Sequence, residues 1–181
     1  EGAHVQWFGQ SVDAQDFTIV ERLAVLARDA ALEQHSVLLA ANALRENIQV
    51  VLDAPGATAR VNTLFAGNRD HQFDLGVTAE HRAPHTVSTL AAKGVLAGKA
   101  QAVVRGLVRI EREAPASDGY QRCDTLLLSP TSEVDPIPRL EINTNDVRCT
   151  HGVTTGHVSP EHLFYLQSRG FSADAARQLL V

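Results

Sequence analysis

The sequence predicts a mainly β protein that ends in a short helical hairpin. Short segments with strand periodicity recur along most of the 181 residues, and turn residues separate them. The apolar residues, 44% of the chain, are mostly Ala, Val and Leu, whereas aromatic residues make up only 5%. Small aliphatic side chains suit the stacked rows of a solenoid, although many short strands also fit a sandwich.

The N-terminal third contains the first expected strands. Residues 1–15 mix polar and aromatic side chains without a clear period. From Phe17 onward the residues favour a strand, although 21–31 are also compatible with a helix. The apolar run at 36–43 has strand length, and 48–52 alternate as a half-buried strand does.

The middle of the chain repeats this organisation. Further strands are expected at 57–65, 73–78, 87–90, 101–110, 125–128 and 140–144. Turn chemistry separates them at 53–56, 83–84, 114–119, 129–131 and 135–138. A loose repeat, in which an aliphatic residue precedes a small or polar corner, starts at Leu26, Leu52 and Leu128. Its first two copies are 26 residues apart, which favours regular coils.

The C-terminal residues change to a helical pattern. Ser159 and Pro160 form a helix start, and Gly170 marks the end of that helix. Ser172 then begins a second helix that runs to Val181. We therefore expect a β domain over 1–158, truncated at its N-terminus, and the beginning of a helical region over 159–181.

Charge and composition exclude several classes of protein. The 16 basic and 21 acidic residues give a net charge of −5, and no basic run is present, which disfavours nucleic-acid binding. No apolar stretch has the length of a membrane span, and no secretory leader is visible. Two cysteines without secretory features indicate a cytoplasmic protein. The absence of methionine, even at position 1, suggests a piece of a longer protein.

Cys149 and His151 are the candidate metal ligands. If 148–154 are extended, these two residues share one face of the strand. A thiolate beside an imidazole suits iron, zinc or an iron–sulfur species, and the same pair could serve as an activated nucleophile. A buried cysteine next to a hydrogen-bonded histidine is the simpler interpretation, because two ligands do not complete a metal site.

The remaining candidates favour structural roles. His81 and His85 flank Pro84, which disfavours the helix that a His-x-x-x-His metal motif needs. His71 belongs to the same cluster of histidines, and His157 and His162 flank the expected helix start as surface residues. Phosphate-binding loops and nucleophile elbows are missing, so no enzymatic activity is expected.

Two segments identify a family resemblance. Residues 138–158 and 161–170 closely resemble the C-terminal signature of the SufB/SufD family of iron–sulfur cluster assembly proteins. Residues 83–88, 93–99 and 126–129 support the match. The SufB branch carries a cysteine, associated with building the cluster, where Ile142 stands, and a glutamate where Gly152 stands. This chain has neither, so it resembles the SufD branch.

The resemblance implies a fold, partners and a site. The family fold is a right-handed parallel β-helix followed by a helical region. The family forms a SufB–SufC–SufD complex, in which SufB pairs through the β-helix and the ATPase SufC docks on the C-terminal helices. His151 would then lie near the SufB interface, where iron or a nascent cluster is handled transiently, with Cys149 beside it. Cys123 matches no functional family position and is expected to be structural.

Two other functions remain open from the sequence. A stand-alone β-helix enzyme or carbohydrate-binding module would need a row of acidic or aromatic residues along one groove, and the chain has few rings. A stand-alone metal-binding module would use Cys149, His151 and nearby carboxylates. We also expect that this piece, which would hold no cofactor alone, could form a homodimer through the face meant for SufB.

Overall fold

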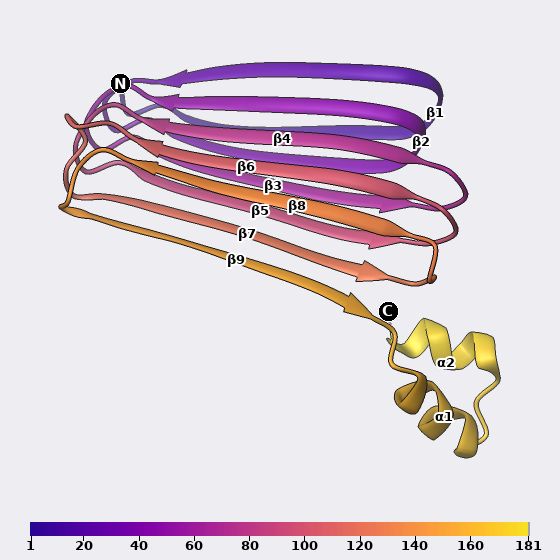
Figure 1. Ribbon diagram of the computed structural model, residues 1–181. Coiled ribbons are helices and arrows are strands. Elements are labelled where there is room, and N and C mark those ends of the chain that lie inside the picture. The colour runs from indigo at the N-terminus through magenta and orange to yellow at the C-terminus, as the bar shows by residue number, and fades with distance from the viewer. Residues whose placement is uncertain (181) are drawn as a thin grey trace.

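The computed structural model describes residues 1–180, without the side chains of 12–16, 40, 41 and 177. Within these residues nine strands precede two helices, which project from the end of the strand stack in Figure 1. The elements are β1 (His4–Leu26), β2 (Ala31–Leu52), β3 (Thr58–Gly67), β4 (Gln72–His81), β5 (Val87–Leu96), β6 (Gln101–Ile110), β7 (Ser117–Leu127), β8 (Glu133–Ile142), β9 (Val147–His157), α1 (Pro160–Ser168) and α2 (Ala173–Leu180).

The strands form a parallel β-solenoid of about five turns. The N-terminal half of β2 pairs with β3, and its C-terminal half pairs with β4. From there β3, β5, β7 and β9 continue as a first face, while β4, β6 and β8 continue as a second face. The predicted parallel β-helix is confirmed, and the sandwich alternative is wrong because every strand pair is parallel.

The coil length explains the loose repeat in the sequence. Leu26 and Leu52, the starts of the first two copies, are register partners on β1 and β2. The third copy lies elsewhere, because the amide of Leu128 donates to the carbonyl of Leu96 at the end of the first face. The first two copies of the repeat therefore mark the same corner in successive coils, whereas the third copy marks the corner at the other end of the strands.

One corner of the solenoid repeats a left-handed backbone conformation. Asp29, His85 and Ala116 have φ between 55° and 59° there, and Gly56 has φ of 78°. The amide of His85 donates to the carbonyl of Pro115 at 3.1 Å, so each corner is bonded to the next coil. Glycine adopts this conformation without steric cost, whereas the other three residues are strained by it.

The interior consists of stacked aliphatic rows in two clusters, one toward each end of the strands. Ala59, Val61 and Ala79 in the first cluster are at most 4% exposed. Phe65 and Phe73 in the second cluster pack with ring centroids 5.8 Å apart. This packing accounts for a core that needs few aromatic side chains.

The expected turn at 135–138 is wrong, because these residues lie inside β8. The amide of Glu133 donates to the carbonyl of Ala100, just before β6, and the amide of Asn143 donates to the carbonyl of Ile110 at the end of β6. The amides of odd-numbered residues of β8 therefore point toward β6. Pro136 and Pro138 therefore stand where an amide would face the unpaired edge. A proline there costs no hydrogen bond of the sheet.

The two chain ends also refine the expectations. Residues 21–26, for which a helix was also considered, belong to β1. Ser159 caps α1 by accepting from the amide of His162, and Ser172 accepts from the amide of Ala175, as predicted. The expected boundary after residue 158 falls between β9 and α1. Neither helix has the length and apolarity needed to span a membrane.

Candidate functional site at the open end of the solenoid

The solenoid is open after its last coil. Among the described residues, β9 pairs only with β7, and β8 pairs only with β6. Side chains on the inner side of β9 therefore continue the core rows without a further strand to cover them. Inward-facing polar groups at this end therefore remain accessible.

Cys149 and His151 occupy this end together, and we call them the open-end pair. They lie opposite Gly119 and Gln121 of β7, which belong to the inner rows of the preceding coil. Because successive residues of a strand point to opposite sides, both members of the pair face the interior side. The structure thus confirms the shared strand face that the sequence predicted.

Cys149 is half-buried against the first core cluster. A Cβ at Gly119 would lie 3.3 Å from its Sγ and only 2.7 Å from a methyl of Val108, so the missing side chain makes room for the thiol. Burial, and secondarily the charge of Asp118, raises the pKa of Cys149 above its usual range. At neutral pH the group is therefore a thiol until a cation favours the thiolate.

His151 contrasts with Cys149, because it is exposed. Its imidazole has no hydrogen-bond or ion-pair partner among the described residues. Nor does the described part of the chain contain a group of three or more His, Cys, Asp or Glu side chains placed to hold a metal ion. The open-end pair can thus supply two ligands, and further ligands have to come from elsewhere.

Gln121 is a residue of this site that the sequence analysis missed. It lies beneath His151 in the same inner row and is 4% exposed. Its Nε2 donates to the carbonyl oxygen of Arg139 at 3.0 Å, which joins β7 of the first face to β8 of the second. A glutamine at an alternating position looks solvent-facing in sequence, so only the register reveals its inward side.

His81 is buried in the middle of the solenoid. Its Nδ1 and Nε2 each lie 2.8 Å from a hydroxyl oxygen, of Thr86 and Ser88 respectively. Thr86 also bonds Ser117 at 2.8 Å, and its hydroxyl donates to the carbonyl of Ala83. Burial lowers the pKa of His81 to about 4, against an opposing contribution from Asp118. A neutral, fully bonded imidazole has a structural role here.

The other expected structural residues also have clear positions. Cys123 is buried in the second core cluster with its Sγ 3.9 Å from Thr125 Oγ1, and burial raises its pKa. His85 lies at a corner with φ of 59°. His157 and His162 are exposed, as predicted.

These features define a class of protein, namely a parallel β-solenoid whose last coil carries a half-buried thiol and an exposed imidazole. Over residues 1–181 the chain matches the family described as "SUF system FeS cluster assembly, SufBD core domain". The chain therefore belongs to the SufBD core domain family.

Individual relatives agree with this assignment. The chain is 34% identical over 157 residues, 87% of its length, to the iron–sulfur cluster assembly protein SufD of Escherichia coli. It is 37% identical over 121 residues to a SufBD family protein of Mycobacterium tuberculosis, and 36% identical over 129 residues to one of Staphylococcus saprophyticus. These matches cover 67% and 70% of the chain. The matched region makes up only 37% of the Escherichia coli protein, 14% of the Mycobacterium tuberculosis protein and 28% of the Staphylococcus saprophyticus protein. The expected likeness to SufD is confirmed.

Proposed function

We propose that this chain belongs to a SufD-like scaffold subunit of a SufBCD complex in iron–sulfur cluster assembly. The observation that carries the proposal is the open-end pair, because it places two ligands of types that iron accepts on the inner row of the uncovered last coil. The subunit itself is non-catalytic in this proposal. Iron or a nascent cluster is its transient cargo, handled at the interface with SufB in the cytoplasm.

The open end offers a surface for a SufB-like partner. The pair supplies two ligands, whereas structural tetrahedral sites and iron–sulfur clusters take about four protein ligands. A partner that covers the last coil would bring the missing ligands and shield the site from water. The same reasoning favours the shared site over a stand-alone metal module built from this chain.

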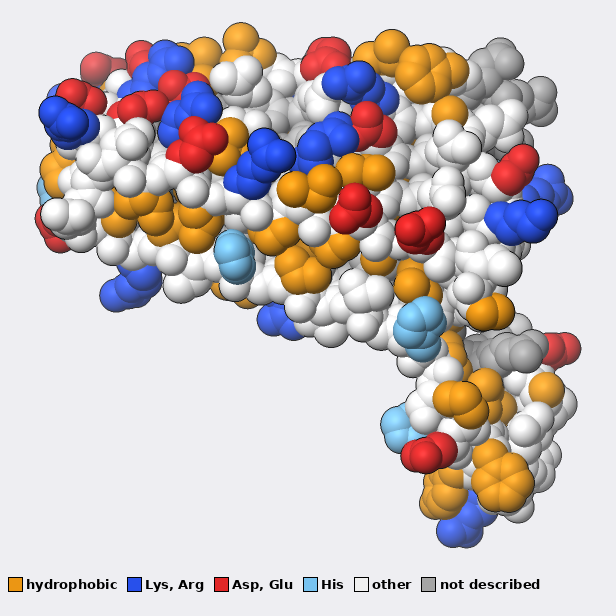
Figure 2. All heavy atoms as spheres, in the orientation of Figure 1, with side chains coloured by type: hydrophobic (Ala, Val, Ile, Leu, Met, Phe, Trp, Pro, Cys, Tyr) orange, Lys and Arg blue, Asp and Glu red, His pale blue; other side chains and the backbone are white. Residues whose placement is uncertain are grey.

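The helical pair offers a separate surface for SufC. Figure 2 shows hydrophobic side chains over this projecting part of the molecule. Phe164 is 73% exposed, and Tyr165 and Leu179 are also exposed. Apolar side chains clustered in this way mark protein contacts. In the proposal, movement of SufC driven by ATP is transmitted through these helices to the interface with SufB, which uncovers His151 for iron entry.

The two ligands then have different tasks. The imidazole of His151 is exposed, so an arriving iron ion reaches one of its ring nitrogens directly. The thiol of Cys149 has to lose its proton first, and the arriving cation supplies the positive charge that favours the thiolate. His151 is thus the entry ligand, and Cys149 binds second.

The test is cluster formation in cells that carry the full-length protein with His151→Ala. We expect cluster yield to fall at least tenfold, and Cys149→Ser to have a smaller effect. His157→Ala is the matched control, because His157 is also an exposed histidine of β9. An unchanged yield with His151→Ala, while the complex still assembles, would remove His151 from the proposal.

A further inference from the structure

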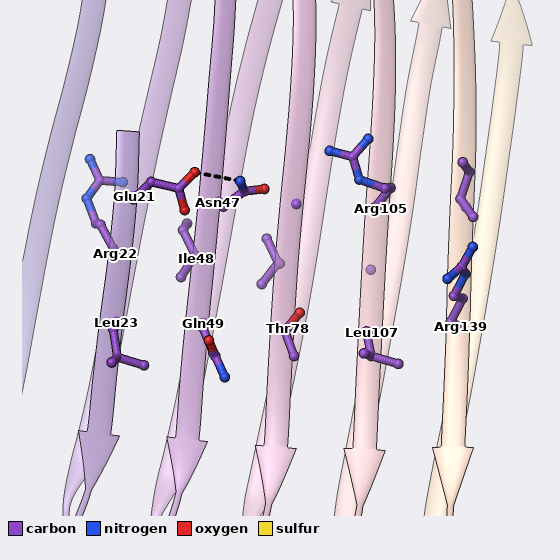
Figure 3. A pocket seen from close by; sticks show the side chains of 14 residues that line it. Glu21, Arg22, Leu23, Asn47, Ile48, Gln49, Thr78, Arg105, Leu107 and Arg139 are labelled. Carbon is purple, nitrogen blue, oxygen red and sulfur yellow. Dashed lines mark hydrogen bonds between the residues drawn. The ribbon is translucent and has the colours of Figure 1, made fainter. Parts of the chain in front are cut away.

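A trough runs across the outer surface of the second face, away from the core (Figure 3). Its volume is about 450 Å³. We call it the outer trough. Two rows of register-paired, outward-facing residues from β1, β2, β4, β6 and β8 form it: Glu21, Asn47, Gly76, Arg105 and Ile137 in one row, and Leu23, Gln49, Thr78, Leu107 and Arg139 in the other.

The floor of the outer trough is low because of Gly76. A side chain at this position would collide with the amide of Asn47, which lies over the glycine. Asn47 is held in place by donating from Nδ2 to Glu21 Oε1 at 2.7 Å, the dashed line in Figure 3. The hollow is therefore a fixed feature of the sheet surface.

One positive charge in the outer trough is uncompensated. Asp74, beside the trough, is paired with Arg105 and lies 3.8 Å from Arg45. On β8, Glu141 accepts from Arg109 at 2.6 Å. The guanidinium of Arg139 has no hydrogen-bond or ion-pair partner in the described part of the chain. Asp74 and Glu141 are thus engaged by other arginines, and Glu21, at the β1 end of the trough, lies four strands away from Arg139. This arrangement leaves Arg139 to attract an anion.

Neutral hydrogen-bonding groups continue the row from Arg139. Thr78 and Gln49 lie on β4 and β2, and their side chains have no bonded partner among the described residues. Leu107 of β6 lies between Thr78 and Arg139 in this row and provides an apolar contact. With strands about 4.8 Å apart, Arg139 and Thr78 lie roughly 10 Å from each other.

We propose that the outer trough binds a small organic oxyanion. A carboxylate or phosphate group pairs with Arg139, the apolar middle of the molecule lies on Leu107, and a polar group at its other end bonds Thr78 and Gln49. Arg and carboxylate or phosphate form charge-assisted, often bidentate hydrogen bonds, which is the strongest recognition available to such a surface. This site is separate from the open-end pair and does not depend on the proposed function.

The test is calorimetric titration of the full-length protein with 6-hydroxyhexyl phosphate and, separately, with 7-hydroxyheptanoate, which carry a phosphate or a carboxylate, an apolar chain and a terminal hydroxyl. We expect Arg139→Gln to weaken binding about tenfold or more, as the loss of a charge-assisted bond implies. Thr78→Val should weaken it about threefold to tenfold through the loss of one neutral bond. Binding of the phosphate probe alone, the carboxylate probe alone or both identifies a phosphate, a carboxylate or either oxyanion as the preferred group.

Arg148→Gln is the matched control, since Arg148 is 81% exposed on β9, outside the trough. Unchanged binding in this variant, together with the loss in Arg139→Gln, supports the proposal. Failure of the wild-type protein to bind either probe at millimolar concentration would overturn it. Equal weakening by the two arginine variants would also overturn it, because that result indicates attraction by net charge alone.

Discussion

His81 and His151 both occupy inner rows of the solenoid, but only His81 is enclosed by the coils on either side. Both nitrogens of His81 are hydrogen-bonded and its side chain is fully buried. His151 lies on the last coil and is exposed, and it has no bonded partner within the described part of the chain. The two residues are of the same type, so their different roles come from their positions in the stack of coils. A histidine with a coil on either side supports the fold, whereas one on the last coil remains available for a ligand.

The largest expected effect on stability comes from His81→Ala. Removal of the ring leaves a cavity and a buried hydroxyl of Ser88 without its partner. The cost should be about 3 kcal/mol or more of the free energy of unfolding. Urea denaturation measures it. His151→Ala should change stability by at most about 0.5 kcal/mol. Similar losses in both variants would break the distinction between the two histidines.

The second effect is a pH dependence that belongs to His81. Its folded pKa is about 4, below the ordinary value of 6.5, because burial disfavours the charged ring. As pH falls below 6.5 the unfolded chain binds a proton that the folded chain does not. Stability should therefore decrease between pH 6.5 and about 4, by about 3 kcal/mol in total from this residue.

Urea titrations over that pH range, compared with His81→Gln, isolate this contribution. The variant should be less stable at neutral pH but should lose less stability on acidification. If both proteins show the same dependence on pH, protonation of His81 is not the cause.

A smaller effect is expected at the floor of the open end. Gln121→Met keeps the volume of the side chain but removes the bond to the carbonyl of Arg139. We expect a loss of about 1–2 kcal/mol in the free energy of unfolding. The exposed Gln101, which bonds Glu133 at 3.3 Å, is the control, and Gln101→Met should be nearly neutral. Equal values for the two variants would show that Gln121 does not join the faces.

The smallest effect concerns the left-handed corner. Ala116→Gly should increase stability by about 0.5 kcal/mol. Glycine relieves the strain of a φ of 57°, and this gain exceeds the cost of the greater freedom of glycine in the unfolded chain. Thermal unfolding measures the change. Ala54→Gly, at a corner residue without positive φ, should destabilise instead. A loss of stability in Ala116→Gly would mean that the corner is not strained.

Much of the fold was predictable because inward and outward residues alternate with a fixed period. The coil spacing was visible at Leu26 and Leu52, which are register partners. A strand was expected at 140–144, but the earlier part of β8 was missed, because Pro136 and Pro138 indicate a turn unless the direction of the unpaired edge is known. Strand propensity alone does not supply that direction.

The candidate site was predictable in part. Cys149 and His151 share a strand face by their spacing, and this was visible in sequence. The contacts of His81 with Thr86 and Ser88 depend on the corner that reverses the chain between them. The bond from Gln121 to Arg139 depends on the closure of two faces, so neither contact has a local pattern.

The central claim is that the open-end pair is one part of a site shared with a partner chain. It is tested most directly by titrating iron(II) anaerobically into the full-length protein, alone and in complex with its SufB-like partner, with His151→Ala in parallel. The account predicts tight binding only in the complex and its loss in the variant. Equally tight binding by the protein without its partner, or by the complex that carries His151→Ala, would contradict it.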